Sequence, residues 1–255
     1  MARRRADVEL VARGLAASRA RARALIMAGA VFSAEQRIDK PGQLLAPDAA
    51  LEVRRRDHPW VSRGGVKLAH ALDRFAISGA GKVALDLGAA TGGFTDVLLD
   101  RGARRVYAVD VGRGQLAWRL RTDPRVIVLE RTNARRLTRV QVPEAAAIVT
   151  CDVSFIGLET VLPAALALAA PGADLVALIK PQFEVGRGEV GKGGVVRDPE
   201  LHAAVCRRIE AWLAARPGWS VVGIADSPIL GPRGNREFLI AARRDGAPPG
   251  PAAPA

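Results

Sequence analysis

From residue 82 onward, short apolar runs of β character alternate with helical stretches, and this alternation limits the possible folds more than any other feature. The apolar runs cover residues 83–87, 106–110, 126–129, 147–152, 175–180, 221–225 and 238–241. Helical patterns cover residues 93–101, 158–170 and 199–215. Alternating strand and helix units favour a doubly wound parallel sheet of the Rossmann-like α/β class, which we expect over residues 66–244.

The residues before this alternation predict a small α+β domain over residues 1–56. Val8, Val11 and Leu15 recur at helical spacing. Ser18 is a good N-cap for a second helix over 19–28, which should stop at Gly29. Short strand-like segments follow at residues 30–32, 37–42 and 50–54.

A charged run ending in proline marks the domain boundary. We expect an interdomain linker over residues 57–65, which then leads into a helix from Leu68 to about Phe75. The tail, residues 245–255, is rich in Gly, Pro and Ala and should be disordered.

The charge balance points to a polyanionic partner. The net charge is +12, and residues 1–65 carry 13 Lys or Arg against 7 Asp or Glu. A basic module of this kind suits nucleic acid first and a membrane surface second. The arginines expected to bind RNA phosphates are Arg3, Arg4, Arg5, Arg19, Arg21 and Arg23. We expect no membrane insertion, because the longest apolar stretch, 161–170, is far shorter than the roughly 20 residues that span a bilayer.

A glycine loop between the first strand and its helix predicts a cofactor site. Its G-x-x-x-G-G spacing, with Asp86 two residues before the first glycine, differs from the dinucleotide fingerprint and suits a nucleoside without pyrophosphate, such as S-adenosylmethionine. Asp86 can meet the amino-acid end directly or through water, and the helix N-terminus can receive the carboxylate. Asp110 ends the next strand and can bind the ribose hydroxyls. The other loop residues expected to contact the cofactor are Gly88, Ala89, Thr91, Gly92, Gly93 and Phe94.

Polar residues at strand ends and helix starts predict the catalytic centre: Lys67, Asp152, Lys180 and Glu237. An apolar strand that runs straight into lysine and proline, as at Lys180, is unusual, because a lysine there is costly unless paired. A ribose 2′-hydroxyl is a poor nucleophile and must lose its proton as it attacks a methyl group. A buried lysine can take that proton or stabilise the developing oxyanion, and carboxylates can orient it.

Other methyl acceptors remain as alternatives. Amino-group methylation usually shows Asp or Asn followed by Pro-Pro and an aromatic residue, and the segment 152–155 lacks the prolines. Base C5 methylation needs a nucleophilic cysteine; Cys151 is the candidate, and its strand position favours a buried core residue. The glycine-rich loop 186–194 follows Lys180 and is expected to be a mobile lid that orders on RNA.

At these residues the sequence resembles the TlyA (hemolysin-A-like) family of ribosomal RNA 2′-O-methyltransferases, over residues from about 3 to 242. Its marks are Val61-Ser62-Arg63-Gly64-Gly65-x-Lys67-Leu68, Asp86-x-Gly88-x-x-Thr91-Gly92-Gly93-Phe94-Thr95, Gly114-Gln115-Leu116-Ala117-Trp118, Arg131-Thr132-Asn133-Ala134-Arg135, Ser154-Phe155-Ile156, Lys180-Pro181-Gln182-Phe183-Glu184 and Gly194-Val195-Val196. The N-terminal part looks like the RNA-binding domain of ribosomal small-subunit protein four, and the catalytic part looks FtsJ-like. His58 stands where the dual-specificity branch of the family has Arg in its linker.

The resemblance implies a Lys-Asp-Lys-Glu tetrad at Lys67, Asp152, Lys180 and Glu237. It also adds Asn133 and Asp152 to the cofactor residues and Arg63 to the RNA-binding residues. The family implies methylation of cytidine ribose in large-subunit rRNA, and in one branch small-subunit rRNA too. We therefore expect a protein that acts on ribosomal RNA or ribosomal subunits, and we expect it to be a monomer. The two cysteines, Cys151 and Cys206, suit a reducing cytosol and no zinc site, so we expect a cytoplasmic protein without a metal. The family name leaves a pore-forming or hemolytic protein as a rival interpretation.

Overall fold

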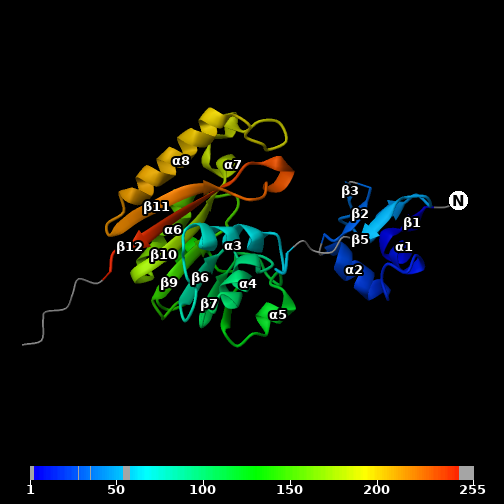
Figure 1. Cartoon of the computed structure of the whole chain (residues 1–255), viewed down its shortest axis with the longest axis horizontal. Coiled ribbons are helices and arrows are strands. Elements are labelled where there is room, and N and C mark those ends of the chain that lie inside the picture. Colours follow the sequence, from blue (N-terminus) through cyan, green and yellow to red (C-terminus); the bar gives the residue numbers. More distant parts are fainter. Residues whose placement is uncertain (1–2, 28, 35, 54–57, 247–255) are drawn as a thin grey trace, which may run out of the picture. The chain divides into compact units, whose positions relative to one another are not determined.

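The computed structural model describes residues 3–27, 29–34, 36–53 and 58–246 (Figure 1). The chain divides into two compact units, Met1–Pro59 and Trp60–Ala255. The start of the expected linker, residue 57, and the expected tail from residue 247 lie outside the described residues.

The first unit packs two helices against short strands around its own apolar core. Its elements are β1 (Arg4–Arg5), α1 (Ala6–Ala12), α2 (Arg19–Met27), β2 (Val31–Ser33), β3 (Gln36–Arg37), β4 (Leu44–Leu45) and β5 (Leu51–Val53). Strand β1 pairs with β4, and β2 lies between β3 and β5. The predicted start of the second helix is confirmed, since the Arg21 amide donates to Ser18 Oγ at 3.2 Å. Helix α2 is described up to Met27, the predicted last residue 28 lies outside the described residues, and Gly29 has φ +67°.

The second unit contains the predicted strand and helix alternation. Its elements are α3 (Gly64–Arg74), β6 (Val83–Leu87), α4 (Gly93–Asp100), β7 (Arg105–Val109), α5 (Trp118–Arg121), β8 (Val126–Leu129), η1 (Ala134–Arg136), β9 (Ala146–Cys151), α6 (Leu158–Ala167), β10 (Ala169–Ile179), α7 (Pro181–Glu184), η2 (Arg187–Glu189), α8 (Pro199–Ala214), β11 (Trp219–Asp226), η3 (Pro232–Gly234) and β12 (Phe238–Arg244). The seven-stranded sheet has the order β11-β12-β10-β9-β6-β7-β8. The α/β class is confirmed.

The sheet is mixed, which corrects the expectation of a parallel one. Strands β10, β9, β6, β7 and β8 are parallel, whereas β12 runs antiparallel to both β10 and β11. The segment between β11 and β12 carries only the short turn η3, without the helix that a parallel crossover needs. Strand β12 therefore inserts between β10 and β11 from the opposite direction.

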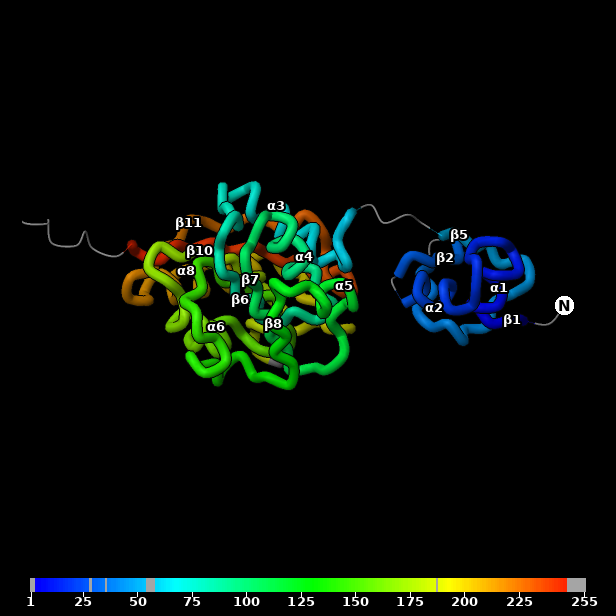
Figure 2. Tube along the Cα trace, turned by 90° about the horizontal axis from the view of Figure 1, so that it is seen from below, coloured from blue at the N-terminus to red at the C-terminus, as the bar shows by residue number. Residues whose placement is uncertain are grey.

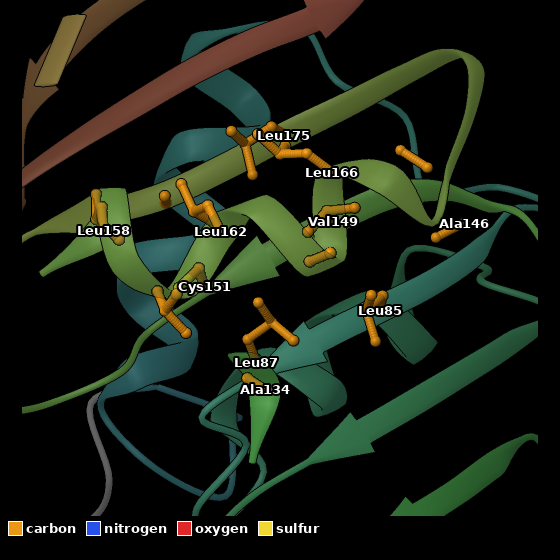
Figure 3. Close-up of a cluster of buried hydrophobic side chains, with 14 of the residues drawn as sticks. Leu85, Leu87, Ala134, Ala146, Val149, Cys151, Leu158, Leu162, Leu166 and Leu175 are labelled. Atoms are coloured by element: carbon orange, nitrogen blue, oxygen red, sulfur yellow. The ribbon is translucent and has the colours of Figure 1, made fainter. Parts of the chain in front are cut away.

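Helices cover both faces of the sheet, and the strand residues alternate between two apolar layers. Residues such as Leu85, Val149 and Leu175 belong to the layer that contains side chains of α6 and α8. Figure 3 shows the α6 part of this layer. Residues such as Ala84 and Ile148 pack with α3, α4 and α5 on the opposite face. The strands accordingly lie between α3 and α6 in Figure 2.

Helix α3 begins at Gly64, four residues before the predicted start at Leu68. A side chain at Gly65 would overlap the Trp60 ring, so the glycine lets the first turn pack closely on the segment that enters the unit. The helix buries Lys67 together with Leu68. None of the helices in the described part of the chain is long and apolar enough to cross a membrane.

Candidate active site

The carboxyl ends of β6 and β9 meet at the point where the order of the parallel strands reverses. In open α/β sheets, ligands bind in the crevice at such a point. The Asp152 amide donates to the Leu87 carbonyl at 2.9 Å. A Cβ on Gly88 would lie 2.8 Å from the Asp152 carbonyl oxygen, and Gly88 has φ +79°. Only glycine fits this position, so the glycine loop after β6 and Asp152 are held in direct contact.

The loop after β6 is a tight turn with positive φ values, and neighbouring side chains pack against it. Ala90 and Gly92 have φ values of +46° and +99°. A side chain at Gly92 would overlap Leu116 and Leu120, so α5 and the segment before it pack against one side of the loop. Thr91 is exposed, while Gly93 and Phe94 are buried in the first turn of α4. The loop thus presents backbone groups and the start of a helix at the sheet edge.

Asp110 ties two turns together beside this loop. One carboxylate oxygen accepts from the Ala90 amide at 2.8 Å and the other from the Gly112 amide at 2.7 Å. The neighbouring Val111 is 72% exposed, which leaves an apolar surface next to the carboxylate. The sequence patterns did not identify Val111; its place after the strand-end acid was the available signal. Asn133 begins η1, where its Oδ1 accepts from the Arg135 amide at 3.1 Å.

Asp86 lies beneath the loop and is fully buried. Its carboxylate accepts from Thr95 Oγ1 at 2.7 Å and from Thr150 Oγ1 at 2.9 Å. Burial raises the pKa of the Asp86 carboxyl to about 6, and the hydrogen bonds from the two threonines oppose this shift. This placement joins β6 to α4 and β9, so Asp86 supports the loop from below.

The expected catalytic residues form two ion pairs. Lys67 Nζ lies 2.5 Å from Glu237 Oε2, across 170 positions in the sequence. Lys180 Nζ lies 2.6 Å from Asp152 Oδ1 and donates to Ser154 Oγ at 3.2 Å. The Lys180–Asp152 contact is an ion pair without hydrogen-bond alignment. Both lysine side chains are only 9% exposed, so their carboxylate partners compensate for the loss of hydration.

Helix α3 connects the two pairs. A Cβ on Gly64 would lie 3.6 Å from Asp152 Oδ2, and one turn later the same helix carries Lys67. A side chain at Gly231 would overlap the Glu237 carboxylate, so this glycine makes room for Glu237. The four residues therefore belong to one site at the sheet edge, next to the cofactor loop.

The glycine-rich loop after Lys180 is fastened to the segment that carries Glu237. Asn235 is buried, and its side chain donates to the Gly194 carbonyl at 3.0 Å and accepts from the Val196 amide at 3.2 Å. Arg233 Nη1 donates to the Gly193 carbonyl at 2.7 Å. These contacts anchor the C-terminal end of the loop; its closure over RNA stays a prediction.

An exposed aromatic side chain stands beside Lys180. Phe155 is 89% exposed and has φ +67°, a conformation that is strained for a side chain of this size. Its ring lies 4.9 Å from that of Phe183, centroid to centroid. The neighbouring apolar residues Val153 and Ile156 are partly buried, so Phe155 is the more exposed side chain of this segment. The sequence patterns included Phe155 in a motif without identifying a role for it.

The remaining predicted residues have clear placements. Cys151 is buried, and burial raises the pKa of its thiol to about 12, which leaves no nucleophilic thiolate near neutral pH.

The expected RNA-binding arginines are all exposed: Arg3, Arg4, Arg5, Arg19, Arg21 and Arg23 in the first unit and Arg63 in the second. Among the described residues, no group of three or more His, Cys, Asp or Glu side chains could hold a metal ion.

Comparison with known families assigns residues 60–244 to an FtsJ-like methyltransferase model and residues 4–51 to an S4 domain model. The chain is 54% identical to the Mycobacterium tuberculosis 16S/23S rRNA (cytidine-2′-O)-methyltransferase TlyA, over 94% of this chain and 90% of that protein. It is 37% identical to hemolysin A of Brachyspira hyodysenteriae, over 92% of this chain and 98% of that protein.

Solved structures agree with these sequence relationships. A candidate hemolysin from Streptococcus thermophilus superposes with a TM-score of 0.74 at 41% identity, covering 97% of this chain and 90% of that chain. An O-methyltransferase from Bacillus cereus, solved in complex with SAH, superposes with a TM-score of 0.50 at 21% identity, over 71% of this chain and 80% of that chain. The second similarity concerns the fold alone.

Proposed function

The chain belongs to the TlyA family of FtsJ-like methyltransferases, and on this basis we propose that it transfers a methyl group from S-adenosylmethionine to the ribose 2′-hydroxyl of a cytidine in ribosomal RNA. The membership confirms the resemblance seen in the sequence motifs. The observation that carries the proposal is the pair of buried lysine–carboxylate contacts beside the glycine loop. We propose that the reaction takes place in the cytoplasm, as expected for an enzyme that modifies ribosomal RNA.

The residues around the loop fit S-adenosylmethionine. Asp110 is a carboxylate at a strand end, suited to ribose hydroxyls, and the exposed Val111 beside it offers an apolar surface to the adenine. The first turn of α4 suits the amino-acid carboxylate. Because Asp86 is buried beneath the loop, we assign it a positioning role. S-adenosylmethionine would supply an electrophilic methyl group bound to its sulfonium sulfur.

Lys180 is the residue that we propose acts on the 2′-hydroxyl. Its ammonium is held by Asp152 and Ser154 at the edge nearest the cofactor loop. There the neutral amine form of Lys180 would accept the hydroxyl proton, or its ammonium form would stabilise the developing oxyanion, as the oxygen–methyl bond forms and the bond from the methyl to the sulfonium sulfur breaks. Lys67, fixed by Glu237, would add a second cation to the same edge. The rest of the rate enhancement would come from alignment of hydroxyl and methyl.

Phe155 supports the assignment of a nucleotide substrate. An exposed aromatic ring gives a base a stacking surface that tolerates any sequence, worth about 1–3 kcal/mol per base. Phe183 supports that ring from behind. We propose that Phe155 stacks on the base of the target nucleotide, which would bring its ribose toward Lys180.

The test identifies the methylated atom. The purified protein, S-adenosylmethionine and unmodified ribosomal RNA are incubated, and the RNA is digested to nucleosides and examined by mass spectrometry. The expected product is 2′-O-methylcytidine. A methyl group on the base would favour the base-methyltransferase alternative instead. Release of dye from lipid vesicles without methyl transfer would favour the hemolytic alternative.

A further inference from the structure

A buried carboxylate in the first unit holds two surface arginines that come from different elements. Asp7, in the first turn of α1, is 0% exposed. It accepts from Arg5 Nε at 3.0 Å through one oxygen and from Arg5 Nη2 at 3.1 Å through the other. The second oxygen also accepts from Arg19 Nη2 at 3.3 Å. Three elements, β1, α1 and α2, therefore converge on one side chain.

Local structure fixes each of the three residues. Arg5 pairs with Leu44 in the β1–β4 ladder, and the Asp7 amide donates to the Pro41 carbonyl at 3.1 Å. Gly42 lies against the Arg5 guanidinium: a Cβ there would be 3.2 Å from Nη1. Arg19 is the first residue of α2, which Ser18 caps. The two guanidiniums thus have little freedom to move apart.

The arginines are held from below and open to solvent above. The side chain of Arg5 is 49% exposed and that of Arg19 is 62% exposed, although both contact a fully buried carboxylate. The hydrogen bond from Arg5 holds the pKa of the Asp7 carboxyl below its usual value, so Asp7 stays charged at neutral pH. Arg23 lies one turn after Arg19 on the same helix face and extends the row of cations.

A guanidinium recognises phosphate best when its planar set of donors is already oriented. A free surface arginine loses side-chain entropy when it binds, and an arginine that is already fixed loses less. We propose that Asp7 is the buried anchor of a phosphate clamp in which Arg5 and Arg19 together bind phosphodiesters of the RNA. The proposal rests on RNA being the substrate, and it makes Asp7 a positioning residue that does not touch RNA.

For removal of the Asp7 charge, the proposal and simple electrostatics predict changes of opposite sign in RNA affinity. Removing a negative charge from a basic surface should strengthen RNA binding if long-range attraction alone matters. If Asp7 orients the clamp, Asp7→Asn should weaken binding, because asparagine cannot accept the forked pair from Arg5 and hold Arg19 as well. The nearby pair Arg37–Asp39 gives a matched control, since Asp39 is 61% exposed and anchors nothing buried.

The experiment uses the full chain and in vitro transcribed large-subunit rRNA as the probe, with affinities measured between about 50 and 200 mM salt. The variants are Asp7→Asn, Asp39→Asn, Arg5→Gln with Arg19→Gln, and the triple variant. We expect Asp7→Asn to weaken binding by roughly fivefold to tenfold and to lower the salt slope by the equivalent of about one bound phosphate. Asp39→Asn should bind at least as tightly as the original chain. The triple variant should bind as the double variant does.

Three outcomes would overturn the clamp. RNA binding by Asp7→Asn that equals or exceeds that of the original chain would mean that Asp7 does not orient the arginines. Further weakening in the triple variant over the double variant would mean that Asp7 acts through the stability of the unit. An unchanged RNA affinity in the double arginine variant would instead count against RNA binding by this unit, while methyl transfer tests the proposed activity separately. Cofactor affinity, which depends on the second unit, should be unchanged in every variant.

Discussion

The ion pairs at the two proposed functional sites differ in where the cation lies. In the first unit the carboxylate is buried and the cations face water: Asp7 is 0% exposed, while Arg5 and Arg19 are 49% and 62% exposed. At the candidate active site of the second unit the cations are buried as well, since Lys67 and Lys180 are each 9% exposed. Exposed cations attract a polyanion over a distance and are screened by salt, whereas buried cations act only on a group that enters the site.

The two sites also differ in the type of cation, with arginine in the first unit and lysine at the candidate active site. Arginine keeps its proton and offers a rigid fork of donors, which suits binding to phosphate. Lysine can give up its proton when its surroundings favour the neutral form, which suits catalysis. We therefore expect substitutions in the first unit to change RNA affinity and salt dependence, and those at the lysines of the second unit to change the rate of methyl transfer.

The largest change should come from Lys180→Ala, which tests the catalytic role of the buried lysines. The rate of single-turnover methyl transfer at saturating RNA should fall by roughly 10²–10⁴, the usual share of general acid–base catalysis. Cofactor and RNA affinities should stay nearly unchanged, because Lys180 acts mainly in the transition state. Lys180→Arg should not restore activity, since a guanidinium keeps its proton. A near-normal rate in Lys180→Ala would assign the role to Lys67 or to electrostatics alone.

Phe155→Ala removes the exposed ring beside Lys180. Loss of base stacking, about 1–3 kcal/mol, should lower kcat/KM for RNA by roughly 5-fold to 150-fold. Phe155→Tyr should retain most activity because the stacking surface remains. Val140→Ala serves as a control, since Val140 is 88% exposed on a segment outside the site. Equal activity of Phe155→Ala and the original chain would remove stacking from the proposed mechanism.

Asp110→Ala tests cofactor binding in the second unit. Loss of a charged acceptor should weaken S-adenosylmethionine binding by about 1.5–3 kcal/mol in calorimetry. The Ala90 and Gly112 amides also lose their acceptor, which should loosen the turn around the loop. Asp100→Ala, an exposed acid at the end of α4, should bind normally. Unchanged affinity in Asp110→Ala would contradict the assignment.

Salt dependence separates the two kinds of cation directly. The logarithm of RNA affinity should fall linearly with the logarithm of salt concentration, with a slope of about 0.7–0.9 per bound phosphate. Replacing Arg5 and Arg19 with glutamine should reduce this slope by about that amount for each phosphate that the variant no longer binds. Lys67→Ala should leave the slope unchanged, because Lys67 is buried against Glu237. An equal change of the salt slope in both variants would mean that Lys67 contributes to phosphate binding as the two arginines do.

Asp86→Asn should change methylation least of these variants. It should clearly change how the free energy of unfolding depends on pH. Burial raises the pKa of Asp86 from 3.8 to about 6, so the folded state binds the proton more tightly than the unfolded chain does. Stability from this group is full below about pH 4 and is lost as pH rises through about 6. Asp86→Asn should therefore gain stability over the original chain across that window, by at most about 3 kcal/mol.

Denaturant titrations at several pH values measure this difference, with Asp100→Asn as an exposed control. A stability difference that stays constant with pH would show that the Asp86 carboxyl is not perturbed. Calorimetry on the same variant tests its role at the cofactor. Weaker S-adenosylmethionine binding by Asp86→Asn would favour direct contact over support from below the loop.

Local patterns were sufficient to predict most elements and to select candidate site residues, whose roles stay predictions. Alternating apolar runs located the strands, Ser18 and Gly29 bounded α2, and the glycine spacing placed the cofactor loop at the end of β6. These features depend on neighbours within a few residues, because capping, positive φ and amphipathic periodicity are properties of a short stretch of chain.

Only the tertiary structure determined which charges meet. Nothing near Lys67 in the sequence indicates that its partner is Glu237, 170 positions away, and that pairing follows from the insertion of β12 between β10 and β11. The depth of Asp86 and the convergence of Arg5 and Arg19 on Asp7 have the same origin. The sequence alone determines which groups are available at the strand ends and helix starts. Burial and partnership depend on the packing of distant segments, which no local pattern encodes.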